Sequence, residues 1–143
     1  TSNMGAVTMS GIARGIMFQL YENLGVMSRT LISDQLKEMP ASAQVVAFKN
    51  GQATLDRGRN AGILNNETMI LFQYEQGFVE PIGVANVKPS NNSSIAQIVK
   101  WKDSNIVEKI KDMSDGEIYR APLNKRVFAV SVGIPADYVK NRL

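Results

Sequence analysis

The chain has 143 residues, of which 44% are apolar and 20% charged, and its formal net charge is +3 at pH 7. Such a chain is globular rather than disordered, and it is long enough to bury a core without disulfides or metals. It contains no cysteine and no histidine, which excludes thiol nucleophiles, disulfides, Cys/His zinc sites and catalysis with imidazole as the general base.

The first part of the chain has the spacing of helices. Residues 8–24 predict an amphipathic helix that Gly25 can end in a left-handed cap, and residues 28–38 predict a second helix before Pro40. A single bent helix is the alternative, because one Gly costs only about 1 kcal/mol inside a helix. The apolar stripe of the first helix comprises Met9, Ala13, Ile16, Met17, Leu20 and Leu24.

After residue 42 the pattern becomes that of short strands with turns between them. Asn50-Gly51 predicts a tight hairpin turn, and Pro81 and Gly83 predict an edge or a bulge within a longer strand. The expected strands cover residues 45–48, 52–56, 68–74, 78–87, 94–101, 117–121 and 126–132.

One short helix interrupts the strands at about residues 104–113, with Asp103 or Ser104 as its N-cap. Its inward residues are expected to be Ile106, Val107, Ile110 and Met113. The order of elements predicts an α+β fold, in which an N-terminal helical arm precedes a small, mostly antiparallel β-barrel of SH3/OB size with one inserted helix. The expected division is an arm at 1–42, a barrel domain at 43–133 and a C-terminal tail at 134–143.

The stretch LDRGRNAGILNNETMILF (55–72) places Gly58 and Gly62 around a short polar run, as a phosphate-binding loop would. However, neither GK[ST] nor GxGxxG occurs, and a strand-like segment follows in place of a helix. We therefore expect a barrel corner at which both glycines adopt positive φ, while Ile63 and Leu64 plug the barrel end. Anion binding by Arg57 and Arg59 is the alternative.

The run VVAF-xx-G-x-ATLDRGRNAGILNNETMILF, with PIGVANV and SSIAQIV after it, resembles the C-terminal barrel of the flagellar assembly protein T family. It is also similar to barrels of curli-secretion-type periplasmic lipoproteins, and the resemblance covers about residues 28–101. It implies a non-catalytic module, periplasmic or associated with the outer membrane, that helps to assemble a structure of the bacterial cell envelope. It implies no cofactor and no metal. We further expect no small-molecule substrate, and partners that are other envelope proteins or copies of the chain itself.

Two kinds of contact surface follow from these patterns. The candidates for a protein interface are Met9, Ile16, Leu20, Leu24 and Trp101. The alternative function is that of a barrel that binds single-stranded nucleic acid through Lys100, Trp101, Lys102, Lys125 and Arg126. Strand alternation favours an inward Trp101 between two outward lysines.

No motif in the sequence indicates an enzyme. The carboxylates fall in turns and on polar helix faces, and no recognisable motif joins Ser28 or Ser33 to Lys37. No apolar run of this sequence has the length of a membrane span.

Overall fold

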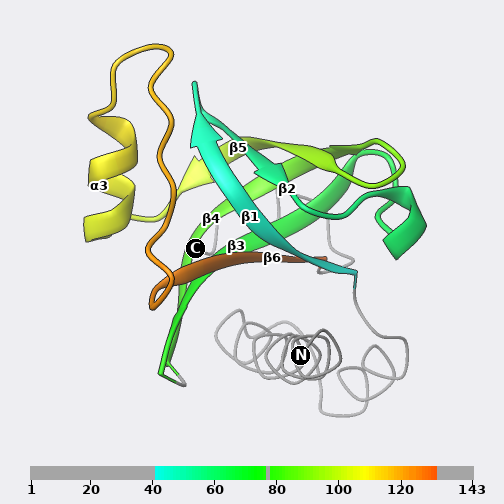
Figure 1. The fold of residues 1–143 in the computed structure, drawn as a ribbon, viewed down its shortest axis with the longest axis horizontal. Coiled ribbons are helices and arrows are strands. Elements are labelled where there is room, and N and C mark those ends of the chain that lie inside the picture. The colour runs from blue at the N-terminus through cyan, green and yellow to red at the C-terminus, as the bar shows by residue number, and fades with distance from the viewer. Residues whose placement is uncertain (1–40, 77, 132–143) are drawn as a thin grey trace.

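The computed structural model describes residues 41–76 and 78–131, which form a closed barrel of antiparallel strands (Figure 1). The strands are β1 (Ser42–Lys49), β2 (Gln52–Leu55), β3 (Glu67–Glu75), β4 (Phe78–Pro89), β5 (Ser94–Trp101) and β6 (Arg126–Ser131). A 3₁₀ turn, η1 (Arg59–Ala61), and one short helix, α3 (Asn105–Lys111), connect them. The predicted helical arm, with Met9, Ile16, Leu20 and Leu24, and the C-terminal tail lie outside the described residues.

The barrel closes in the order β1-β2-β5-β4-β3-β6, because β6 pairs back with β1. Every pairing in it is antiparallel. The predicted barrel with one inserted helix is thus confirmed, and its closure leaves no continuous free sheet edge. β1 begins at Ser42, so the strand includes a residue that the sequence placed in the arm.

The β1–β2 hairpin follows directly from two residues. Asn50 and Gly51 have φ angles of 52° and 73°, the left-handed values that both positions of a two-residue type I′ turn require. Asn and Gly tolerate these angles better than other residues do. The predicted hairpin is therefore confirmed.

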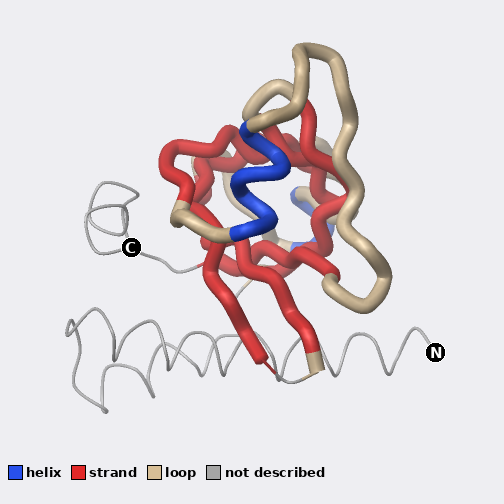
Figure 2. The backbone as a smooth tube through the Cα atoms, turned by 90° about the vertical axis from the view of Figure 1, so that its left-hand side faces the viewer, coloured by secondary structure: helices blue, strands red, loops and turns tan. Residues whose placement is uncertain are grey.

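β4 is one strand with two register shifts, as Pro81 and Gly83 suggested. One shift lies opposite Leu71 and Phe72 on β3, and the other lies at Val84 on the β5 side. Strand pairing with β5 begins only at Gly83, and the start of β4 projects with the end of β3 beyond the barrel wall (Figures 1 and 2). Pro81 lies in this projecting part, where it interrupts no ladder with β5. Ile82 is still buried in the core cluster.

The core fills the barrel and extends under α3, which lies across one end of it (Figure 2). Ile106, Val107 and Ile110 of this helix are buried in the same cluster as Phe48 and Leu55. The N-cap is Ser104, whose hydroxyl accepts a hydrogen bond from the Val107 N–H at 3.3 Å. Both the helix and its inward face agree with the sequence.

The expected strand at 117–121 is reduced to a single bridge. Tyr119 exchanges two backbone hydrogen bonds with Phe48, of 2.8 and 2.9 Å. The strand prediction is therefore wrong beyond this one bridge.

Candidate protein-binding groove

The two glycines of the 55–72 stretch form a corner for different physical reasons. Gly62 ends η1 with a φ of 89°, as expected. Gly58 does not have positive φ, and this expectation was wrong: its φ is −141°. Instead, a Cβ atom on Gly58 would lie 2.6 Å from the carbonyl oxygen of Ser93 and nearer still to that of Ser90. Space, and not backbone angle, requires glycine at this position.

The backbone donors of residues 59–63 are already used within the corner. The N–H groups of residues 59–63 all donate to carbonyl oxygens, the first two to Ser90 at 2.8 Å and Asn91 at 3.0 Å. The others close the turn onto Gly58 and Arg59 at 3.0–3.3 Å. A phosphate loop needs such groups to converge on the ligand. The structure therefore supports the corner and not the phosphate loop.

Only one of the two expected plugs enters the barrel. Ile63 is buried in the core cluster, whereas Leu64 exposes 65% of its surface. Two consecutive residues after a left-handed turn cannot both point inward when the chain is extended, so the pair divides between core and solvent.

The carboxylates of residues 41–76 and 78–131 do not gather into a metal-binding cluster. No group of three or more acidic residues in those ranges could hold a metal ion. Glu67 is half-buried and accepts a hydrogen bond from the Ser131 hydroxyl, which ties β3 to β6. Asp112, Asp115 and Glu117 are exposed in the turns beyond α3.

The residues proposed for nucleic-acid binding do not come together as a stacking platform. Trp101 is half-buried against the core cluster, with its ring centroid 5.8 Å from that of Phe48. Lys125 pairs with Glu75 at 3.8 Å, which neutralises part of its charge. Lys100 lies on β5 and Arg126 on β6, and β4 and β3 lie between these two strands in the barrel.

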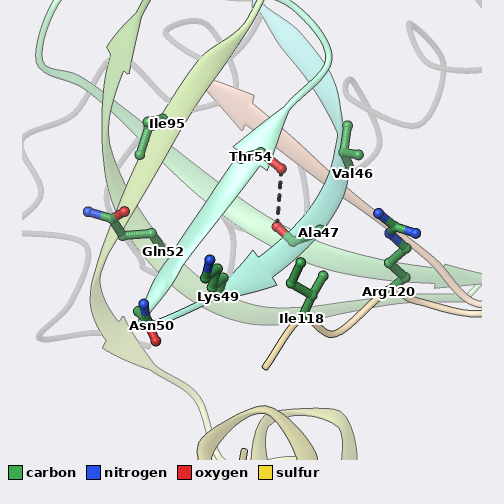
Figure 3. Close-up of a pocket in the computed structure, with 9 residues that line it drawn as sticks. All are labelled: Val46, Ala47, Lys49, Asn50, Gln52, Thr54, Ile95, Ile118 and Arg120. Atoms are coloured by element: carbon green, nitrogen blue, oxygen red, sulfur yellow. Dashed lines mark hydrogen bonds between the residues drawn. The ribbon is translucent and has the colours of Figure 1, made fainter. Parts of the chain in front are cut away.

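The surface that the sequence did not reveal is a groove outside β1, β2 and β5 (Figure 3). We call it the β1–β2–β5 groove, and its volume is about 450 Å³. The segment 118–120 forms its far side, with Ile118 and Arg120. Its lining includes the side chains of Val46, Thr54, Ile95, Ile118, Lys49 and Arg120.

Three aliphatic side chains of the groove are open to water. Val46, Ile95 and Ile118 expose 50%, 48% and 55% of their surfaces. Val46 points outward by ordinary strand alternation, since its neighbour Val45 is buried. Thr54 pairs with Ile95, so that both share the outer face. Separate exposed aliphatics are ordinary on a protein surface, but a group that lines one groove marks an interaction site.

The polar groups of the groove are cationic or neutral. Lys49 and Arg120 carry the charge, and none of the lining residues is acidic. Gln52 already donates to Gln97 at 3.3 Å, and the Thr54 hydroxyl donates to the Ala47 carbonyl at 3.4 Å. The groove therefore offers apolar contact and positive charge.

The sequence does not show that these residues lie together, because they come from β1, β2, β5 and the loop after α3. The one local sign is the pair Val45-Val46, where adjacent apolar residues break the alternation of a strand with one wet face.

No known family model matches the chain, and no curated protein matches it. The resemblance to flagellar and curli-type barrels therefore stays a prediction. No helix within residues 41–76 and 78–131 has both the length and the apolar character that crossing a bilayer requires.

Proposed function

We propose that this domain is a non-catalytic assembly module that binds a partner protein in the β1–β2–β5 groove. The observation that carries the proposal is the row of half-exposed aliphatic side chains, Val46, Ile95 and Ile118, beside Lys49 and Arg120. The cell-envelope setting, periplasmic or associated with the outer membrane, rests on the sequence resemblance. A flagellar structure is the assembly that this resemblance favours.

The chemistry of the groove selects the partner. Aliphatic side chains favour Val, Ile or Leu on the ligand, and the absence of acidic lining residues beside Lys49 and Arg120 favours carboxylates. A shallow strip along strands fits an extended segment better than a compact ligand. The partner is thus an extended protein segment that alternates aliphatic and acidic residues.

Binding in so small a groove is weak for a single copy. In an envelope structure many copies act together, and linked sites raise the overall affinity by a factor on the order of 10²–10⁴. A rigid closed barrel suits this role, because little of the binding energy is lost in ordering the site.

Methyl NMR on the full chain tests the proposal with two synthetic decapeptides, one alternating Val with Glu and one alternating Val with Lys. The acidic peptide should shift the methyl signals of Val46, Ile95 and Ile118 saturably, and the basic peptide should leave them unchanged. Arg120→Glu should abolish the effect. Lys109→Glu makes the same charge change on the exposed face of α3 and should preserve it.

The proposal fails if neither peptide shifts the groove methyls, or if Lys109→Glu weakens binding as much as Arg120→Glu. In the second case the net charge of the domain, and not the groove, would attract the peptide.

A further inference from the structure

A second apolar surface lies on the outside of the barrel, away from the groove. β3 and β6 carry apolar residues at consecutive positions, Met69–Phe72 and Val127–Val130, so both faces of the sheet are apolar there. The inward members include Leu71 and Ala129, which belong to the core cluster. The outward members, which we call the outer apolar face, are Ile70, Phe72, Val84, Phe128 and Val130.

The strand register shows that these residues share one face. Ile70 is paired with Val84 on β4 and with Val130 on β6. Phe72 is paired with Phe128, and their rings stack with centroids 5.6 Å apart. Directly paired residues of an antiparallel ladder project to the same side, so the outer apolar face is continuous across three strands.

This face is buried although it points away from the barrel interior. Ile70, Phe72, Val84 and Val130 expose 0% of their surfaces, and Phe128 exposes 7%. Val46 and Ile95, which lie on the outside of the same barrel without a cover, expose 50% and 48%. α3, the α-helix of the described residues, packs at the barrel end instead (Figure 2). The outer apolar face therefore requires another cover.

The path of the chain points to the cover. The Ala41 carbonyl accepts a hydrogen bond from the Ser131 N–H at 2.8 Å, and Ser42 is paired with Val130. The first 40 residues therefore join the barrel beside the outer apolar face. Residues 8–24 would span about 25 Å as a helix, and this length exceeds the width of three strands at about 4.8 Å spacing. Residues 25–40 suffice as a connection, since an extended chain reaches about 3.3 Å per residue.

We propose that residues 8–24 dock on the outer apolar face of the same chain and bury their apolar stripe there. The stripe, with Ile16 and Leu20 at its centre, has the apolar character that the face requires. This inference is independent of the function proposed for the groove, because the two surfaces lie on different strands. It makes the helical arm a sealing element of the barrel and leaves the groove as the surface for partners.

Residues 132–143 follow Ser131, the last residue of β6, and are therefore a second candidate for the cover. Their apolar residues are interrupted by Gly133 and Pro135 and by the charges of Asp137, Lys140 and Arg142. They offer no apolar stripe comparable to that of residues 8–24. A second copy of the chain is the third candidate for the cover. Thiol labelling distinguishes residues 8–24, residues 132–143 and a second copy.

The absence of cysteine permits a direct test by thiol labelling of single-cysteine variants of the full chain. V130C reports on the outer apolar face, its neighbour A129C reports on the barrel interior, and V46C reports on the open groove. We expect V46C to react quickly with a maleimide, and both V130C and A129C to react slowly. The arm is then altered by I16D/L20D, with Q19D/N23D as a matched control that adds the same charge beside the stripe.

In the I16D/L20D background the labelling rate of V130C should rise about tenfold or more, because the cover opens locally while the barrel stays folded. A129C should stay slow, and Q19D/N23D should leave V130C protected. If A129C also becomes reactive, the barrel itself has opened, and the milder pair I16A/L20A replaces I16D/L20D. This pair should raise the labelling rate of V130C and leave that of A129C unchanged.

The inference is overturned if V130C stays protected in both arm variants, which would assign the cover to residues 132–143. It is equally overturned if the protection of V130C in the unaltered arm is lost on dilution, which would assign the cover to a second copy.

Discussion

The carbonyl oxygen of Ser90 lies where the Cβ atom of a side chain on Gly58 would begin. The same oxygen accepts a hydrogen bond from the Arg59 N–H at 2.8 Å. The corner at Gly58 is thus packed directly against the loop between β4 and β5. The Ser94 hydroxyl adds a hydrogen bond to the Arg57 carbonyl at 2.7 Å. What resembled a ligand loop in the sequence is a contact between two turns of the barrel.

Gly58→Ala should therefore destabilise the fold more than Gly62→Ala does. The new methyl group at Gly58 meets the backbone oxygens of Ser90 and Ser93, and overpacking of this kind costs about 1–3 kcal/mol or more. At Gly62 the space is open, and only the φ of 89° penalises the change, by about 1 kcal/mol. Urea denaturation of the two variants measures the difference. Equal stability, or a reversed order, would contradict the packing at this corner.

The same corner should not bind phosphate. Because the N–H groups of residues 59–63 donate to carbonyls, an anion would have to break hydrogen bonds that hold the two loops together. Titration of the full chain with inorganic phosphate and with ATP should leave the amide signals of Arg59 and Asn60 unshifted in ¹⁵N NMR spectra at constant ionic strength. Saturable shifts confined to these amides would support anion binding at Arg57 and Arg59 instead.

Substitution of Trp101 distinguishes a structural role of this residue from a role in nucleic-acid binding. Because its ring packs against Phe48 and the core, Trp101→Ala should lower the free energy of unfolding by about 2–4 kcal/mol. Lys102→Ala, at an exposed neighbour, should change it by less than about 0.5 kcal/mol. A fluorescent oligo-dT should show no rise in anisotropy with the unaltered chain at low salt, and salt-sensitive binding abolished by Trp101→Ala would support the alternative instead.

The sequence predicted those features that depend on neighbouring residues. Asn50-Gly51 predicted the hairpin, and Ser104 predicted the start of α3. Pro81 and Gly83 predicted the irregular strand. Each of these residues acts through local backbone geometry. Closure of the barrel followed from the number and regularity of short strands. The reason for glycine at position 58 could not be predicted, since it lies in a contact with Ser90, far along the chain.

The two apolar surfaces of the barrel differ in how much of each the sequence reveals. The groove joins Val46, Ile95 and Ile118 through the order of strands, which alternation alone does not determine. The outer apolar face was visible as the unbroken runs Met69–Phe72 and Val127–Val130. Such runs indicate strands buried on both sides.

Site-specific photocrosslinking in the cells that make the protein tests most directly whether the groove holds a partner. A photoreactive amino acid replaces Ile118 in the groove, and a second variant carries it at Lys109, exposed on α3. The account predicts a discrete adduct from position 118 alone, lost with Arg120→Glu. Mass spectrometry should place the crosslink in a partner segment rich in acidic and aliphatic residues. The absence of an adduct at position 118, or the same adduct from both positions, would contradict it.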